Sequence, residues 1–264
     1  MTAPTACDFS TPSGKALSQF LSTYGAWLMG VGATCIRLEK NVKRIARAYN
    51  KEAEIFIMPH HIHISVWDEG SSDATTSLAT VRHTPISFNI NTALSELSWE
   101  IADNKIDFDT AVHKFRHIIN NDRQNKWIVL FLVTLANASF CRLFGGDMVA
   151  MAIVGIATMS GYYLKQLLLE RNVDIRAVAV ICSFVSSVLG ATDALFAIGD
   201  TPMIAVGTSV LYLVPGIPFL NSFSDLLYRH YLCAFGRFAD AVVLTCCLSF
   251  GLCAGMLLMH IGMF

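Results

Sequence analysis

The chain has 264 residues, of which 54% are hydrophobic and 15% charged, and its formal net charge is −1. This balance excludes a strongly basic nucleic-acid-binding protein. The charges are unevenly distributed, because residues 1–126 carry 13 Lys/Arg and 13 Asp/Glu whereas residues 127–264 carry only 6 and 7. The sequence therefore predicts a polar N-terminal domain, residues 1–126, followed by a membrane domain, residues 127–264.

The N-terminal domain is predicted to be a small α/β domain. Apolar residues recur at helical spacing between residues 15 and 31. Polar residues interrupt this run, so an amphipathic helix is favoured over a cleaved signal peptide. A second helix is expected after Thr34, and two more after Asn91 and Asp107, which are all suitable N-caps. Alternating or β-rich segments predict strands at 53–58, 61–67 and 78–84.

The second helix has a basic face, formed by Lys40, Lys43, Arg44 and Arg47. Close to a membrane, such a face can contact anionic lipid headgroups. The simpler interpretation is a face exposed to solvent, and the sequence leaves both open.

Histidines raise the question of a metal site in this domain. His60, His61 and His63 cluster at the start of the strand predicted at 61–67, and His113 and His117 are spaced i, i+4 on a helix. Zinc accepts such spacings, but no acidic residue lies at a diagnostic offset. The eight cysteines show no C-x-x-C pair, and there is no nucleophile elbow, P-loop or dinucleotide fingerprint. We therefore expect no metal, no cofactor and no catalytic residue.

Five apolar runs predict five transmembrane helices, at about 127–144, 148–164, 177–198, 204–224 and 239–262. Lys and Arg are concentrated in the second and fourth connections. By the positive-inside rule, these connections and the N-terminal domain are cytoplasmic, and the C-terminus is outside. An odd number of spans also suggests a partner: a second five-span unit would have inverted topology, and inverted repeats build transport paths. No internal copy is evident, so that unit is expected in another chain.

Two features of the apolar runs favour a transport site. Asp193 lies inside the third run, where an ionisable side chain is costly and often functional. In the fourth run, Pro215, Gly216 and Pro218 follow one another. Prolines remove backbone donors, and a helix broken within the membrane is how many transporters build a binding site. The alternative is a kink that only shapes helix packing.

Three stretches resemble the threonine/serine exporter family. They are Gly32–Glu39, the turn Phe140–Asp147, and Ser209–Asn221 with Asp225 after it. The resemblance covers about residues 15–262, and within the family the chain is similar to the larger subunit of two-component bacterial succinate exporters. Five positions match the family's motifs: Glu39 on the cytoplasmic side, Pro215, Gly216, Asn221 and Asp225.

The resemblance implies an α-helical integral membrane protein with five transmembrane helices, preceded by a small α/β cytoplasmic domain. It would be a subunit of an exporter in the bacterial inner membrane, for threonine, serine or a dicarboxylate such as succinate. Its expected partners are a small integral membrane subunit of the same family, membrane lipids and the small-molecule substrate; no nucleic acid is expected, and a homo-oligomer is possible.

On this reading, Pro215 and Gly216 expose backbone groups and Asn221 and Ser222 bind substrate, while Asp225 or Asp193 couples a proton. Two alternatives stay open. One is a structural or regulatory partner of the transporting subunit. The other is a membrane-anchored enzyme with a histidine-based metal site in its N-terminal domain.

Overall fold

The computed structural model describes residues 12–261 except 72, 83, 105, 122–124 and 197–198. Cys7 and the predicted ends of two spans, 198 and 262, lie outside the described residues. The chain forms two compact units: residues 1–122 with 217–238, and residues 123–216 with 239–264. The predicted boundary at residue 126 divides the chain differently, because the first unit also contains α10 and the start of α11.

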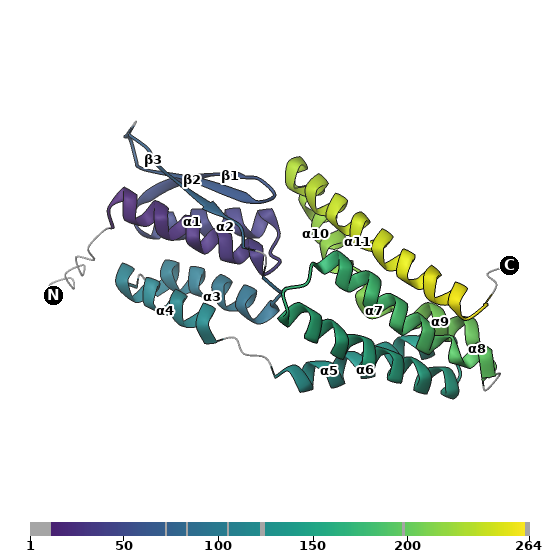
Figure 1. Cartoon of the computed structure of the whole chain (residues 1–264). Coiled ribbons are helices and arrows are strands. Elements are labelled where there is room, and N and C mark those ends of the chain that lie inside the picture. The colour runs from purple at the N-terminus through teal and green to yellow at the C-terminus, as the bar shows by residue number, and fades with distance from the viewer. Residues whose placement is uncertain are drawn as a thin grey trace. The chain divides into compact units, whose positions relative to one another are not determined.

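The first unit combines a small sheet with helices (Figure 1). Its elements are α1 (Gly14–Gly30), α2 (Cys35–Ala48), β1 (Lys51–Ile57), β2 (His61–Asp68), β3 (Thr75–Thr80), α3 (Phe88–Asn104), α4 (Phe108–Asn121), α10 (Gly216–Leu227) and the first turns of α11 (Tyr231–Leu258). The strands pair antiparallel in the order β1-β2-β3, with Ile55 opposite Ile64. Helices α1 and α2 cover one face of the sheet, and α3 and α4 form a third layer (Figure 1).

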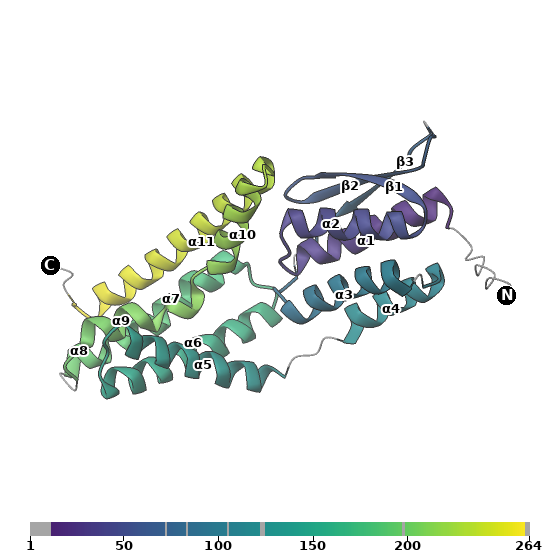
Figure 2. The same cartoon turned by 180° about the vertical axis from the view of Figure 1, so that it is seen from behind.

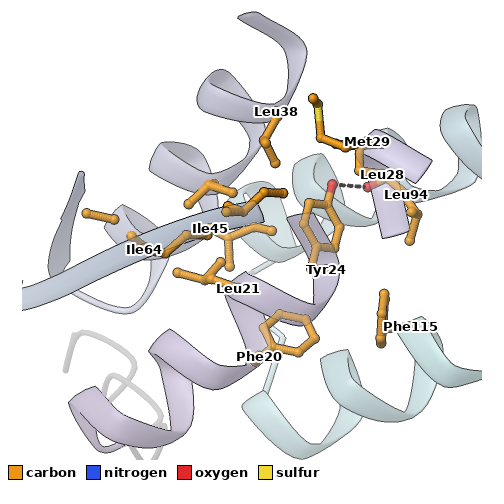
Figure 3. Close-up of a cluster of buried hydrophobic side chains, with 14 of the residues drawn as sticks. Phe20, Leu21, Tyr24, Leu28, Met29, Leu38, Ile45, Ile64, Leu94 and Phe115 are labelled. Atoms are coloured by element: carbon orange, nitrogen blue, oxygen red, sulfur yellow. Dashed lines mark hydrogen bonds between the residues drawn. The ribbon is translucent and has the colours of Figure 1, made fainter. Parts of the chain in front are cut away.

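The core of this unit lies between the sheet and the two helical layers. Alternation places Ile62, Ile64 and Val66 of β2 in the core, where each is at most 1% exposed. Tyr24 of α1 is fully buried, and its hydroxyl donates to the carbonyl oxygen of Leu94 at 2.8 Å (Figure 3). A buried hydroxyl needs such a partner, so this bond joins α1 to α3 in a fixed register.

The predicted bounds of the third helix and of the third strand in this unit were wrong. The third helix begins at Phe88, before Asn91, and the side chain of Ser87 accepts from the N–H of Ile90 at 3.3 Å. Ser87 rather than Asn91 therefore caps the helix. The third strand, β3, ends at Thr80, four residues earlier than expected. Asp107 was predicted correctly, since its carboxylate accepts from the N–H of Thr110 at 3.1 Å.

The second unit is helical. It contains α5 (Lys126–Leu143), α6 (Met148–Glu170), α7 (Ile175–Gly190), α8 (Thr192–Phe196), α9 (Pro202–Ser209), the 3-10 turn η1 (Leu211–Leu213) and the rest of α11. Helices α5 and α6 lie side by side in both views (Figures 1 and 2). Within the described residues, four helices are long and apolar enough to span a membrane, or five if the broken pair 202–213 and 216–227 is one span.

Small residues let α7 approach its neighbours closely. A methyl group at Gly251 of α11 would collide with the hydroxyl of Ser183 and the carbonyl oxygen of Val180. One turn on, a methyl group at Gly255 would come within 2.8 Å of Ser187. Glycines spaced four apart against serines are a packing arrangement typical of membrane helices.

The fourth predicted span is broken between Leu213 and Gly216, where the prolines lead us to expect it. Pro215 follows the 3-10 turn and ends the first segment, since it has no N–H to donate. Pro218 is the third residue of α10. A helix leaves the N–H groups of its first turn unpaired, so proline at this position costs no hydrogen bond. Pro215 thus ends one helical segment and Pro218 lies in the first turn of the next, so neither proline bends a continuous helix.

Candidate functional site

Asp225 is the centre of a buried polar cluster in the first unit. Its Oδ1 accepts the backbone N–H of Cys35 at 2.8 Å, and its side chain is completely buried. Cys35 is the first residue of α2, where N–H groups have no partner within the helix. Thr34 occupies the N-cap position without capping through its side chain, so Asp225 of α10 supplies an acceptor there. A carboxylate is also favoured at this end of the helix dipole.

Arg237 of α11 neutralises this carboxylate. Its Nη1 lies 3.1 Å from Asp225 Oδ2, an ion pair without hydrogen-bond geometry. Its Nη2 donates to the carbonyl oxygen of Ala33 at 2.7 Å. Asn221 donates to the neighbouring carbonyl, that of Gly32, at 2.8 Å. Gly32 has φ +94°, a conformation that glycine adopts without strain, and it presents the two carbonyls in succession.

The remaining predicted residues of the first unit lie around this cluster. The Ser222 hydroxyl donates to the carbonyl oxygen of Ala234 at 2.7 Å, which ties α10 to α11. Glu39 lies 2.7 Å from the Lys43 ammonium and 3.6 Å from His230 Nε2. The hydrogen bond to Glu39 raises the pKa of Lys43 above its ordinary value. Asn221 and Ser222 thus each donate one hydrogen bond to a backbone carbonyl of the protein itself.

Asp193 lies in the second unit, at the start of the short helix α8, and is also completely buried. Its Oδ1 accepts the N–H of Gly199 at 2.8 Å. Its Oδ2 is buried and has no hydrogen-bond partner among the described residues. An unpaired buried carboxylate oxygen is unusual, because its desolvation is not compensated.

A second carboxylate lies close to Asp193. A methyl group at Gly199 would come within 2.9 Å of both Asp147 Oδ2 and Asp193 Oδ1, so these oxygens flank one glycine. Asp147 caps α6 by accepting from the N–H of Ala150 at 2.7 Å, and it also accepts from the Thr201 hydroxyl at 3.1 Å. Backbone N–H donors, first that of Asp200 and then that of Ala150, lower the pKa of Asp147. The two carboxylates therefore differ: Asp147 is well supplied with donors, and Asp193 is not.

A buried polar network lies further along the helices of this unit. Asn137 of α5 is 3% exposed, and its amide donates to the Thr158 hydroxyl at 2.5 Å and to the carbonyl oxygen of Thr208 at 3.1 Å. The hydroxyls of Ser186 and Tyr212 lie 2.9 Å apart. These bonds satisfy polar groups between apolar helices, which is what membrane burial requires.

The predicted site residues fall into two groups. Glu39, Asn221, Ser222 and Asp225 belong to the first unit, and Asp193, Pro215 and Gly216 belong to the second. Their roles in binding and proton coupling stay predictions.

Sequence reasoning missed Arg237 and Gly199, and it treated Asp147 only as part of a turn. No local pattern indicates Arg237 or Gly199, because their partners are distant in the sequence. Among the described residues, no group of three His, Cys, Asp or Glu side chains is arranged to hold a metal ion.

The family model and the relatives that match this chain all describe membrane transport proteins. The family model described as "Putative threonine/serine exporter" matches residues 19–259. Two relatives are named "Probable succinate transporter subunit YjjP". The protein from Klebsiella aerogenes is 25% identical over 244 residues, which cover 92% of this chain and 93% of the relative. The protein from Escherichia coli (strain K12) is 25% identical over 237 residues, which cover 89% and 91%. No solved structure matches the chain significantly.

Proposed function

Because this chain belongs to the threonine/serine exporter family, we propose that it is the larger subunit of a two-chain secondary exporter in the bacterial inner membrane. The chain is a membrane transport protein and not an enzyme, as the names of its relatives also indicate. In the proposed topology, the N-terminal domain is cytoplasmic and the C-terminus is outside, in agreement with the distribution of Lys and Arg.

The proposed partner is a small membrane protein of the same family. Both relatives are named as subunits and match almost over their whole length, which supports a function shared with another chain. The proposed substrates are small polar metabolites: threonine or serine, after the family description, or a dicarboxylate such as succinate, after the relatives' names.

Asp193 carries the proposal for the coupling step. Its buried Oδ2 has no hydrogen-bond partner among the described residues, so no bond within the protein occupies that oxygen. In secondary transporters, buried carboxylates of this kind form proton relays. We assign proton coupling first to Asp193 and second to Asp225, whose charge is already balanced by Arg237. Substrate contacts at Asn221, Ser222 and the backbone near Pro215 and Gly216 belong to the same proposal.

The test is transport in vesicles that contain this chain with and without its small partner. Efflux of labelled threonine, serine and succinate is followed under a proton gradient. We expect efflux of one substrate class only when both chains are present. In the complex, Asp193→Asn should abolish gradient-driven efflux but preserve exchange of labelled for unlabelled substrate, which needs no net proton movement.

The matched control is Asp240→Asn, because Asp240 is an exposed carboxylate on α11. Equal loss of efflux in both variants, or full gradient-driven efflux in Asp193→Asn, would remove Asp193 from the mechanism. Export by the partner alone would contradict a transporting role for this chain.

A regulatory role is the second candidate, and the Asp225 cluster favours it. Asp225, Arg237 and Asn221 bind α10 and α11 to the loop before α2, in the same compact unit as the polar domain. If this chain only gates its partner, the partner should export substrate without it. In the complex, Asp225→Ala should then change the rate of export but not which substrates are exported.

A further inference from the structure

A pocket of about 420 Å³ lies between α2 and α3 of the first unit. Three cationic side chains of α2 line it: Arg37, Lys40 and Arg44. Their spacing of three and four residues places them on one helical face. Asn41, Ser95 and Trp99 also line the pocket. The volume falls within the range of small-molecule sites.

The cations in the pocket differ from those beside it in their acidic neighbours. Among the described residues, no carboxylate forms an ion pair with Arg37, Lys40 or Arg44. On the same helix but outside the pocket, Lys43 pairs with Glu39 and Glu54, and Arg47 pairs with Glu52. The helix therefore neutralises the cations outside the pocket and leaves three positive charges within it.

Neutral groups hold the two arginines in place. Arg37 donates to Asn91 Oδ1 at 3.0 Å. Arg44 donates to Asn41 Oδ1 at 3.0 Å and to the Ser98 hydroxyl at 2.6 Å. These acceptors orient the guanidinium groups without cancelling their charge, as a preorganised anion site requires.

Arg44 is fixed from a further side by an aromatic ring. Its guanidinium carbon lies 3.5 Å from the centre of the Trp99 ring, a cation–π contact. Burial lowers the pKa of Arg44 by more than the attraction of Tyr24 and Asp103 raises it. The charge is thus partly desolvated and would be stabilised by an anion.

We propose that this pocket binds a small oxyanion with at least two negative charges, carried by carboxylate or phosphate groups. Planar guanidinium groups suit both chemistries, because each presents paired N–H donors to two oxygens. The Lys40 ammonium adds a third charge. A free metabolite and the headgroup of an anionic lipid share this chemistry, and we assign the site to a free dianion.

The pocket lies beside the start of α2, so binding there would affect that end of the helix. Thr34 and Ile36 also line it, and they flank Cys35, whose N–H is held by Asp225. An anion here would stabilise the start of α2 and, with it, the contacts to α10 and α11. The concentration of a cytoplasmic dianion would thus affect how firmly α10 and α11 are held against the start of α2.

Binding is tested on the purified full-length chain with its partner, in neutral detergent at low ionic strength. Succinate and inorganic pyrophosphate serve as probes in calorimetric titrations. Lys40→Gln is the principal variant, because Lys40 makes no ion pair with any described residue, so its loss is expected to leave the fold intact. We expect it to weaken binding about tenfold or more, as when one charged hydrogen bond is lost.

The control is Arg47→Gln, which removes the same charge from the same helix outside the pocket. It should bind as the wild type does. No binding of either probe, or an equal loss in both variants, would overturn the proposal, because equal loss indicates a diffuse electrostatic attraction. Succinate is also a proposed substrate, so pyrophosphate binding and the contrast between Lys40→Gln and Arg47→Gln, rather than total succinate binding, distinguish this pocket from the transport site.

Nanodiscs distinguish the two sources of the anion. In discs of neutral lipid, pyrophosphate or succinate should bind as in detergent. If discs with anionic lipid prevent that binding, and Lys40→Gln weakens lipid association equally, the headgroup occupies the pocket and our assignment to a free dianion is overturned.

Discussion

Asp225 of α10 and Arg237 of α11 form an ion pair, with 3.1 Å between Oδ2 and Nη1, although the Asp225 side chain is completely buried. Each also bonds to the backbone around the start of α2, at Cys35 and Ala33. Burying two charges is costly unless they are paired and further hydrogen-bonded. The pair therefore fixes three helices of the first unit relative to one another.

Arg237→Gln should destabilise the protein strongly, because it leaves the Asp225 carboxylate buried without a counter-charge. The expected loss is about 3–5 kcal/mol. The double variant Asp225→Asn with Arg237→Gln should be more stable than the sum of the single effects predicts. Thermal unfolding in detergent measures the stability of the wild type, of the single variants Asp225→Asn and Arg237→Gln, and of the double variant. Additive effects would show that the pair does not interact energetically.

Gly199→Ala should perturb the carboxylate pair of the second unit. The added methyl group would lie 2.9 Å from oxygens of both Asp147 and Asp193, so one of them must move. We expect efflux to fall at least tenfold, if Asp193 couples the proton. Gly207→Ala is the control, since nothing lies within 4 Å of its methyl group and alanine favours a helix. Equal efflux in the two variants would contradict the prediction.

Gly251→Ala should weaken the contact between α11 and α7. Its methyl group would collide with backbone and side-chain atoms of α7, and such overpacking typically costs about 1–3 kcal/mol. The melting temperature in detergent measures this loss. Cys246→Ala, on an exposed part of the same helix, should leave it unchanged. A wild-type melting temperature for Gly251→Ala would mean that the helices are not in close contact.

Alkaline pH should destabilise the first unit through its buried tyrosines. Burial, and then the charge of Asp107, raises the pKa of Tyr49 to about 12, and burial also raises the pKa of Tyr24. The folded state favours the neutral phenol. This stabilisation is therefore complete below the ordinary pKa of 10.0 and is lost as the pH rises through the folded value. The phenolate absorbance of the wild type minus that of Tyr49→Phe, followed against pH, should show that the Tyr49 hydroxyl ionises near pH 12. Ionisation near pH 10 would refute this prediction.

The sequence by itself determined the local features of this protein. Apolar runs of nearly the right length located the helices that are long and apolar enough to span a membrane, because such helices are defined by composition. Pro215 located the break in the fourth predicted span, because a proline has no N–H to donate. The side chain of Asp107 and the alternation along β2 fixed a helix start and a strand face for similarly local reasons. The stretches Gly32–Glu39 and Ser209–Asn221 also indicated the family.

The tertiary structure alone decided which polar groups meet. Asp225 caps a helix that begins 190 residues earlier in the chain, and its partner Arg237 follows a turn that no periodicity predicts. Gly199 separates Asp147 from Asp193, and α3 converts one basic face of α2 into a pocket. Contacts of this kind depend on how helices pack, and packing places side chains that have no relation in the sequence within a few ångströms of one another.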